Sequence, residues 1–155
     1  MTEHVTRTAG AVPDAPVPAP APRRLLDLSR ADSLALLGSV RLGRIVFTRN
    51  ALPAIRPVNH ILDEGQIVIR THGDSALALQ TGGSGIGGVV VAYEADQIDP
   101  DTHQGWSVVV TGYARVITDP EKLARYQALL TAWVDTVMDA AVVIRPDMVT
   151  GFRLD

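Results

Sequence analysis

The segment from Leu52 to Ala76, LPAIRPVNHILDEGQIVIRTHGDSA, places polar side chains inside an otherwise apolar, β-rich stretch. These polar residues are Arg56, Asn59, Arg70, Thr71 and Ser75. Guanidinium, amide and hydroxyl groups can together hydrogen-bond an anion and the polar edge of a ring. The segment therefore predicts a pocket for an anionic, planar ligand.

The first polar group lies on a predicted strand, residues 53–62. Strand alternation puts Arg56 and His60 on one face and Pro57 and Asn59 on the other. Pro57 has no N–H to donate, so the strand has an edge, a bulge or a departure from pairing at this point. Main-chain groups left open there can read the hydrogen-bonding edge of a heterocycle. The alternative is a surface arginine and a turn-like asparagine at a bulge.

The second polar group lies where the next predicted strand gives way to a short helix. Arg70 and Thr71 end the strand, and Ser75 begins the helix. Backbone N–H groups at a helix start, with a hydroxyl and an arginine nearby, bind phosphate. The same Thr-x-Gly-x-Ser pattern also occurs as plain helix capping.

Other chemistries have less support in the sequence. The scattered histidines, His4, His60, His72 and His103, lack the spacing of a metal site, so we expect no metal. The serines lack a GxSxG context, and the absence of cysteine excludes thiol catalysis. The glycine-rich run 82–88 precedes a strand rather than a helix, which favours a connector over a phosphate loop. No catalytic residue is assigned.

Composition narrows the class of protein. The chain has 155 residues, 46% of them hydrophobic and 20% charged, which is typical of one globular domain. A net charge of −3 argues against general nucleic-acid binding. No apolar run approaches the roughly 20 residues of a membrane helix. We expect a cytoplasmic domain at 25–155, preceded by a flexible Pro/Ala-rich tail at 1–24, with neither nucleic acid nor membrane as partner.

The elements that position these groups are mainly strands. We expect strands at 43–48, 53–62, 66–71, 88–98, 106–117, 140–146 and 148–155. We expect helices at 28–40, 74–80 and 119–134, the first capped by Ser29 and ended by Gly38. Asp63-Glu64-Gly65 is a hairpin turn, and Gly112 indicates a bulge or a bend. Short connections mean antiparallel pairing, so the fold class is mainly β (α+β), an antiparallel barrel of six to seven strands with flanking helices.

Trp106 follows Gly105 at the start of the longest predicted strand. An aromatic side chain at a strand end can stack on a ring, lie in a dimer interface or pack in the core. All three interpretations of Trp106 agree with the sequence. Trp133, on the last predicted helix, is interpreted as a packing residue.

The order of these motifs resembles the pyridoxamine 5′-phosphate oxidase-like family of FMN-binding split-barrel proteins. The resemblance covers about residues 25–155, and RPVNH, IVIRT, EADQIDPDTHQGWSVVVTG and VTGFRL carry it. It implies a split β-barrel, a homodimer with flavin sites at the subunit interface, and an FMN-dependent oxidoreductase acting on a small molecule. The cofactor-binding residues that it implies are Arg56, Pro57, Val58 and Asn59 along the flavin ring, Arg70, Thr71 and Ser75 at the phosphate and ribityl chain, and Trp106 and Ser107 from the other subunit.

One position departs from the family pattern. Relatives commonly carry a lysine directly after the loop serine, whereas Ala76 follows Ser75 here and Asp74 adds a negative charge. A charge-assisted phosphate contact contributes roughly 1.5–3 kcal/mol. The departure leaves three alternatives to an FMN enzyme: an oxidoreductase that binds the deazaflavin F420, a flavin or F420 carrier without turnover, and a cofactor-free dimeric barrel.

Overall fold

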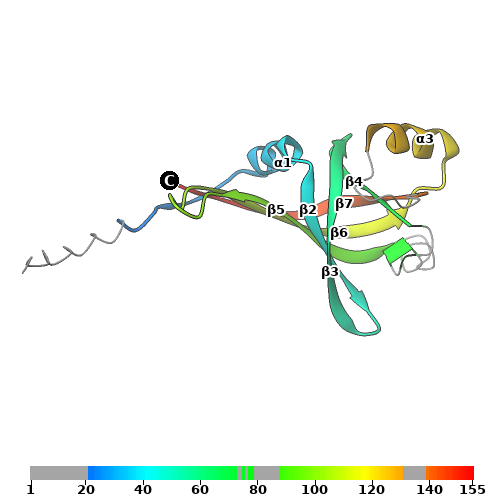
Figure 1. Ribbon diagram of the computed structural model, residues 1–155, viewed down its shortest axis with the longest axis horizontal. Helices are drawn as coiled ribbons and strands as arrows, with labels where there is room; N and C mark the ends of the chain where they lie inside the picture. The colour runs from blue at the N-terminus through cyan, green and yellow to red at the C-terminus, as the bar shows by residue number, and fades with distance from the viewer. Residues whose placement is uncertain (1–20, 73–74, 76, 79–87, 131–138) are drawn as a thin grey trace, which may run out of the picture.

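The structure is a computed structural model that describes residues 21–72, 75, 77–78, 88–130 and 139–155 (Figure 1). The described part is mostly β. Its strands are β1 (Leu25–Asp27), β2 (Leu42–Arg49), β3 (Leu52–Asp63), β4 (Gln66–Thr71), β5 (Val89–Ile98), β6 (Gly105–Val116) and β7 (Ala140–Leu154). Its helices are α1 (Arg30–Ser39) and α3 (Pro120–Leu129).

The strands form one antiparallel sheet that closes on itself. The strand order is β1-β7-β4-β3-β2-β5-β6, and β6 also pairs with β7. Because β6 pairs with β7, the strands β7, β4, β3, β2, β5 and β6 close into a barrel. The short strand β1 pairs with β7 and extends the sheet there. The predicted antiparallel split barrel of six to seven strands is confirmed.

Local sequence explains the tight β3–β4 turn. Glu64 and Gly65 both have positive φ, 51° and 75°, between the paired residues Asp63 and Gln66. Such a two-residue turn needs left-handed backbone at both positions, which glycine adopts at no steric cost. The predicted hairpin at Asp63-Glu64-Gly65 is confirmed.

The last strand differs from its prediction, because one strand, β7, replaces the two expected at 140–146 and 148–155. The pairing of β6 with β7 shifts register between Thr111 and Gly112, so the chain passes Pro146 and Asp147 without ending the strand. A Cβ on Gly112 would lie 1.7 Å from the Arg145 carbonyl oxygen. Of the predicted bulge or bend at Gly112, the structure shows a bulge in the β6–β7 pairing, whose extra residue, Asp147, lies on β7.

The helices begin where their caps predict and end elsewhere. The Ser29 hydroxyl accepts a hydrogen bond from the Asp32 N–H at 3.0 Å, as an N-cap does. The predicted end at Gly38 is wrong, since α1 continues to Ser39. The helix predicted over 119–134 ends at Leu129, where its last carbonyls meet a side chain of β4.

Further predicted features fall wholly or partly outside the described residues. These are most of the tail, most of the helix expected at 74–80, the glycine-rich run, and Trp133. The division into a tail and a domain at residue 25 stays a prediction.

Two apolar clusters lie on opposite faces of β4. Ile67 and Ile69 point into the barrel, where the main cluster also contains Leu37 of α1. Val68 points outward, where it packs with a second cluster beneath α3, formed by Tyr126, Leu130, Ala141 and Val143. Because side chains alternate along a strand, Arg70 continues the outward row and Thr71 the inward row.

Candidate functional site

Thr71 and Ser75 meet at the end of β4. The Thr71 hydroxyl donates to Ser75 Oγ at 2.9 Å, and the Ala78 N–H donates to the same oxygen at 3.1 Å. The Ser75 N–H in turn donates to the His72 carbonyl at 3.0 Å. The structure thus joins two predicted site residues into one compact group of hydroxyl and N–H donors, with Ser75 in the geometry of a helix cap.

The Arg70 guanidinium lies on the other face of the same strand. Its Nη1 donates to the Leu130 carbonyl at 2.7 Å, and Nη1 also lies 3.4 Å from the Gln127 carbonyl oxygen. Both acceptors belong to the C-terminal end of α3. In this structure the guanidinium therefore contacts the helix end rather than the Thr71–Ser75 hydroxyls.

The other predicted polar group lies along an open edge of β3. This strand pairs with β2 from Leu52 to Asn59, but with β4 only from His60 to Asp63. The His60 N–H donates to the Arg41 carbonyl on the β2 side, at 2.8 Å. Strand alternation then directs the main-chain groups of Pro57 away from β2, toward the edge that no described strand covers. Of the predicted possibilities for Pro57, a sheet edge is the one that the structure shows.

Arg56 and Val58 lie beside this open edge. The Arg56 Nη1 donates back to the Ile55 carbonyl at 2.7 Å, so its guanidinium stays near the strand. Val58 is partly buried and packs against the barrel interior. Asn59 is half-buried at the point where β3 leaves the open edge and begins to pair with β4.

Trp106 and Ser107 point to opposite faces of β6. The Trp106 side chain is 7% exposed and belongs to the main apolar cluster. Of its three interpretations, core packing is the one that the structure supports. Ser107 faces outward, between Asp96 of β5 and Phe152 of β7.

Sequence reasoning missed a buried polar pair behind β3. His60, 1% exposed, lies with Nδ1 2.6 Å from the Tyr93 hydroxyl and Nε2 2.8 Å from the Leu37 carbonyl oxygen. A carbonyl only accepts, so Nε2 carries the proton and Tyr93 donates to Nδ1. Burial lowers the pKa of His60, and burial followed by the charge of Glu94 raises the pKa of Tyr93. Alternation along β5 places Tyr93 inward, but nothing in the sequence pairs it with His60.

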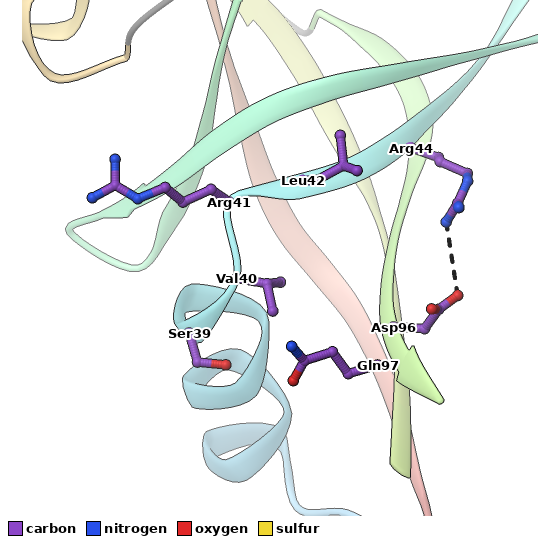
Figure 2. Close-up of a pocket in the computed structure, with 7 residues that line it drawn as sticks. All are labelled: Ser39, Val40, Arg41, Leu42, Arg44, Asp96 and Gln97. Carbon is purple, nitrogen blue, oxygen red and sulfur yellow. Dashed lines mark ion pairs between the residues drawn. The ribbon is translucent and has the colours of Figure 1, made fainter. Parts of the chain in front are cut away.

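A charged group lies where β2 and β5 diverge. Arg44 contacts Glu94 at 3.1 Å and Asp96 at 3.7 Å, and Figure 2 shows Asp96 facing Arg44 across the gap. Burial, with a hydrogen bond to Asp96, raises the pKa of Glu94. Arg44 and Asp96, but not Glu94, line a cavity of about 450 Å³ together with Ser39, Val40, Arg41, Leu42 and Gln97. None of the site residues predicted from the sequence lines this cavity.

The described residues contain no helix that is both long enough and apolar enough to span a bilayer.

Comparison with known proteins gives the family. The family model described as pyridoxamine 5′-phosphate oxidase matches residues 29–153. The uncharacterized protein Rv0080 of Mycobacterium tuberculosis is 51% identical over 132 residues, which are 85% of this chain and 87% of that protein.

Solved structures agree with this assignment. A Corynebacterium glutamicum protein, provisionally named as a pyridoxamine 5′-phosphate oxidase, is 32% identical with a TM-score of 0.69, over 88% of this chain and 96% of that one. The FAD binding protein of Mycobacterium smegmatis is 30% identical with a TM-score of 0.61, over 85% of this chain and 100% of that one. The chain therefore belongs to the pyridoxamine 5′-phosphate oxidase family, as its motif order predicted.

Proposed function

We propose that this protein is a flavin-dependent oxidoreductase that uses FMN and acts on a small molecule in the cytoplasm. The observation that carries the proposal is the joined hydroxyl pair, Thr71 and Ser75, at the end of β4. The M. smegmatis relative is named for binding FAD, which supports a flavin in general. The flavin would supply the electron-transfer chemistry, and the protein would supply binding and orientation.

The donors around Ser75 suit a phosphate group. Hydroxyls donate to phosphate oxygens without any charged side chain, and the Ser75 hydroxyl, which accepts from Thr71 and Ala78, keeps its own proton to donate. Arg70, the residue before Thr71, is the cation that would complete this site. The sequence has Ala76 in place of the family lysine, so Arg70 would be the main source of positive charge there.

The open edge of β3 suits the flavin ring. We propose that Arg56, Pro57, Val58 and Asn59 lie along the ring, with the Pro57 carbonyl accepting a hydrogen bond from the ring N–H. Pro57 has no N–H, so a neighbouring strand would gain few hydrogen bonds along this edge. A planar ligand that donates a hydrogen bond to the Pro57 carbonyl fits this edge better than another strand does.

We propose that a second copy of the chain completes the site. The outward face of β5, β6 and β7 exposes large apolar side chains: Val90, Val109, Tyr113, Met148 and Phe152. Cross-strand pairing places them on one face with Ser107. Contiguous exposed apolar side chains mark interaction surfaces. A homodimer through this face would bring Ser107, and the main chain of Trp106, toward the partner's cofactor.

The second candidate is an F420-dependent protein, and the observation that favours it is Ala76. Loss of a lysine at the phosphate weakens the contact expected for FMN. A ligand with additional contacts elsewhere depends less on that one cation. A cofactor-free barrel is an outcome of the same titration, whereas a carrier would bind a cofactor and show no turnover.

The test is a fluorescence titration of the purified protein with FMN, FAD, riboflavin and F420. Tighter binding of FMN than of riboflavin is the expected result, because only FMN presents a phosphate to Thr71 and Ser75. Thr71→Val should reduce that preference about tenfold. Thr118→Val, in the exposed segment before α3, is the matched control and should leave it unchanged. Tighter binding of F420 favours the second candidate, and binding of no cofactor at high micromolar concentration overturns both.

A further inference from the structure

Arg70 lies on β4, the strand that leads into the proposed phosphate site. Its side chain contacts the C-terminal end of α3. Its Nη1 lies 2.7 Å from the Leu130 carbonyl oxygen and 3.4 Å from that of Gln127. The last carbonyls of a helix have no partner within the helix, and they form the negative end of its dipole. A guanidinium at this position satisfies the carbonyls and is attracted by the dipole. Arg70 therefore stabilises the C-terminal end of α3.

Leu130 anchors the end of α3 by burial of its side chain. This side chain is 4% exposed and belongs to the cluster that includes Val68 of β4 and Tyr126 of α3. The next residue toward the N-terminus, Leu129, is 47% exposed and lies outside both clusters. Packing of Leu130 against β4 thus fixes the carbonyl that Arg70 contacts.

The same guanidinium is the nearest cation in sequence to the Thr71–Ser75 hydroxyls. A phosphate carries full negative charge, whereas the helix carbonyls carry partial charge, so an arginine–phosphate contact is the stronger of the two. Arg70 Nη1 is held on the outward side of β4, whereas Thr71 continues the inward row, so reaching a phosphate beside Thr71 would require Nη1 to leave the Leu130 carbonyl.

We infer that the Arg70 guanidinium has two alternative partners, the carbonyls at the end of α3 and a phosphate beside Thr71 and Ser75. It holds the end of α3 when no phosphate is bound, and it leaves the helix to contact the phosphate of a bound cofactor. This inference rests on the proposed function, because it requires a phosphate-bearing ligand beside Thr71 and Ser75. Leu130 is then a positioning residue, which acts on the cofactor only through Arg70.

The coupling works in both directions. A change that loosens the end of α3 frees Arg70 and strengthens phosphate binding, and phosphate binding loosens the end of α3 by the same free energy. Riboflavin has the same ring but no phosphate, so it leaves Arg70 on the helix. The ratio of FMN affinity to riboflavin affinity therefore measures how strongly α3 competes for Arg70.

The experiment combines hydrogen exchange with titration on the full chain. The Leu130 amide, which donates to the Tyr126 carbonyl, reports on the last turn of α3. Saturating FMN should speed its exchange several-fold, and saturating riboflavin should leave it unchanged. Leu130→Ala should raise the ratio of FMN to riboflavin affinity several-fold, whereas Leu129→Ala, the matched exposed control, should not. Arg70→Ala should lower the ratio about tenfold.

The outcomes separate this inference from the proposed function. If FMN binds more tightly than riboflavin but Leu130 exchange and the Leu130→Ala ratio do not change, Arg70 stays on α3 and the inference is wrong while the proposed function stands. If neither ligand binds, both are wrong. Should Leu130→Ala fail to fold, Tyr126→Phe replaces it, since it removes only the hydroxyl that donates to Asp63 Oδ2.

Discussion

Tyr93 donates its hydroxyl proton to Nδ1 of His60 across 2.6 Å inside the barrel. The two rings meet edge to face, with an interplanar angle of 77°. His60 also donates from Nε2 to the Leu37 carbonyl, so one imidazole links β3, β5 and the end of α1. The pair stabilises the barrel in its neutral form only, because a protonated His60 could no longer accept from Tyr93.

Stability should therefore fall in mild acid. The unfolded chain binds a proton on His60 below a pH of about 6.5, whereas burial holds the pKa of the folded side chain lower. The stabilisation is fully present above pH 6.5 and is lost as the pH falls from there toward the folded pKa. Urea unfolding between pH 7.5 and 5 measures this slope. His60→Gln should flatten it, whereas exposed His103→Asn should not; equal slopes in all three proteins would contradict the assignment.

Removing the Tyr93 hydroxyl should destabilise the barrel. Tyr93→Phe leaves Nδ1 of His60 buried without its donor, and an unsatisfied buried acceptor costs about 1–3 kcal/mol. Urea unfolding at pH 7.5 measures the loss. Tyr113→Phe is the matched control, because Tyr113 is exposed on the outward face. Similar losses in the two variants would mean that the hydrogen bond to His60 contributes nothing.

A side chain at Gly112 should be poorly tolerated. In Gly112→Ala the new Cβ would overlap the Arg145 carbonyl, so backbone must move at the bulge between β6 and β7. We expect a loss of at least about 3 kcal/mol in the free energy of unfolding. Gly65→Ala has open space around its Cβ and only a positive φ to oppose it, so its cost should be about 1–2 kcal/mol. A larger loss of unfolding free energy in Gly65→Ala than in Gly112→Ala would show that the backbone at the bulge moves at little cost.

A charge on the outward face should prevent assembly. Met148 is one of the apolar side chains that we propose contact a second copy of the chain, and it is 66% exposed. Met148→Glu should convert a dimer into a monomer in sedimentation velocity, because burying an unpaired carboxylate is strongly unfavourable. Leu25→Glu, at an apolar side chain on β1 that is 58% exposed, is the control that should stay dimeric. A dimer that survives Met148→Glu would place the interface elsewhere.

Local features of the fold could be predicted because neighbouring residues determine them. The Asp63-Glu64-Gly65 motif marked the β3–β4 turn, and the Ser29 cap marked the start of α1. The end of α3 escaped prediction because Leu130 is anchored by contacts with other elements. The continuity of β7 escaped because the bulge at its own Pro146 and Asp147 is defined only by the pairing with Thr111 and Gly112 of β6.

The sequence by itself determined the family and the antiparallel barrel, since both follow from local patterns and motif order. Only the tertiary structure decided where Arg70 and Trp106 point. Arg70 meets a carbonyl 60 residues away, and Trp106 packs in an interior built from several strands and α1. The physical reason is that alternation gives the face of a side chain, whereas its partner depends on which distant element folds against that face.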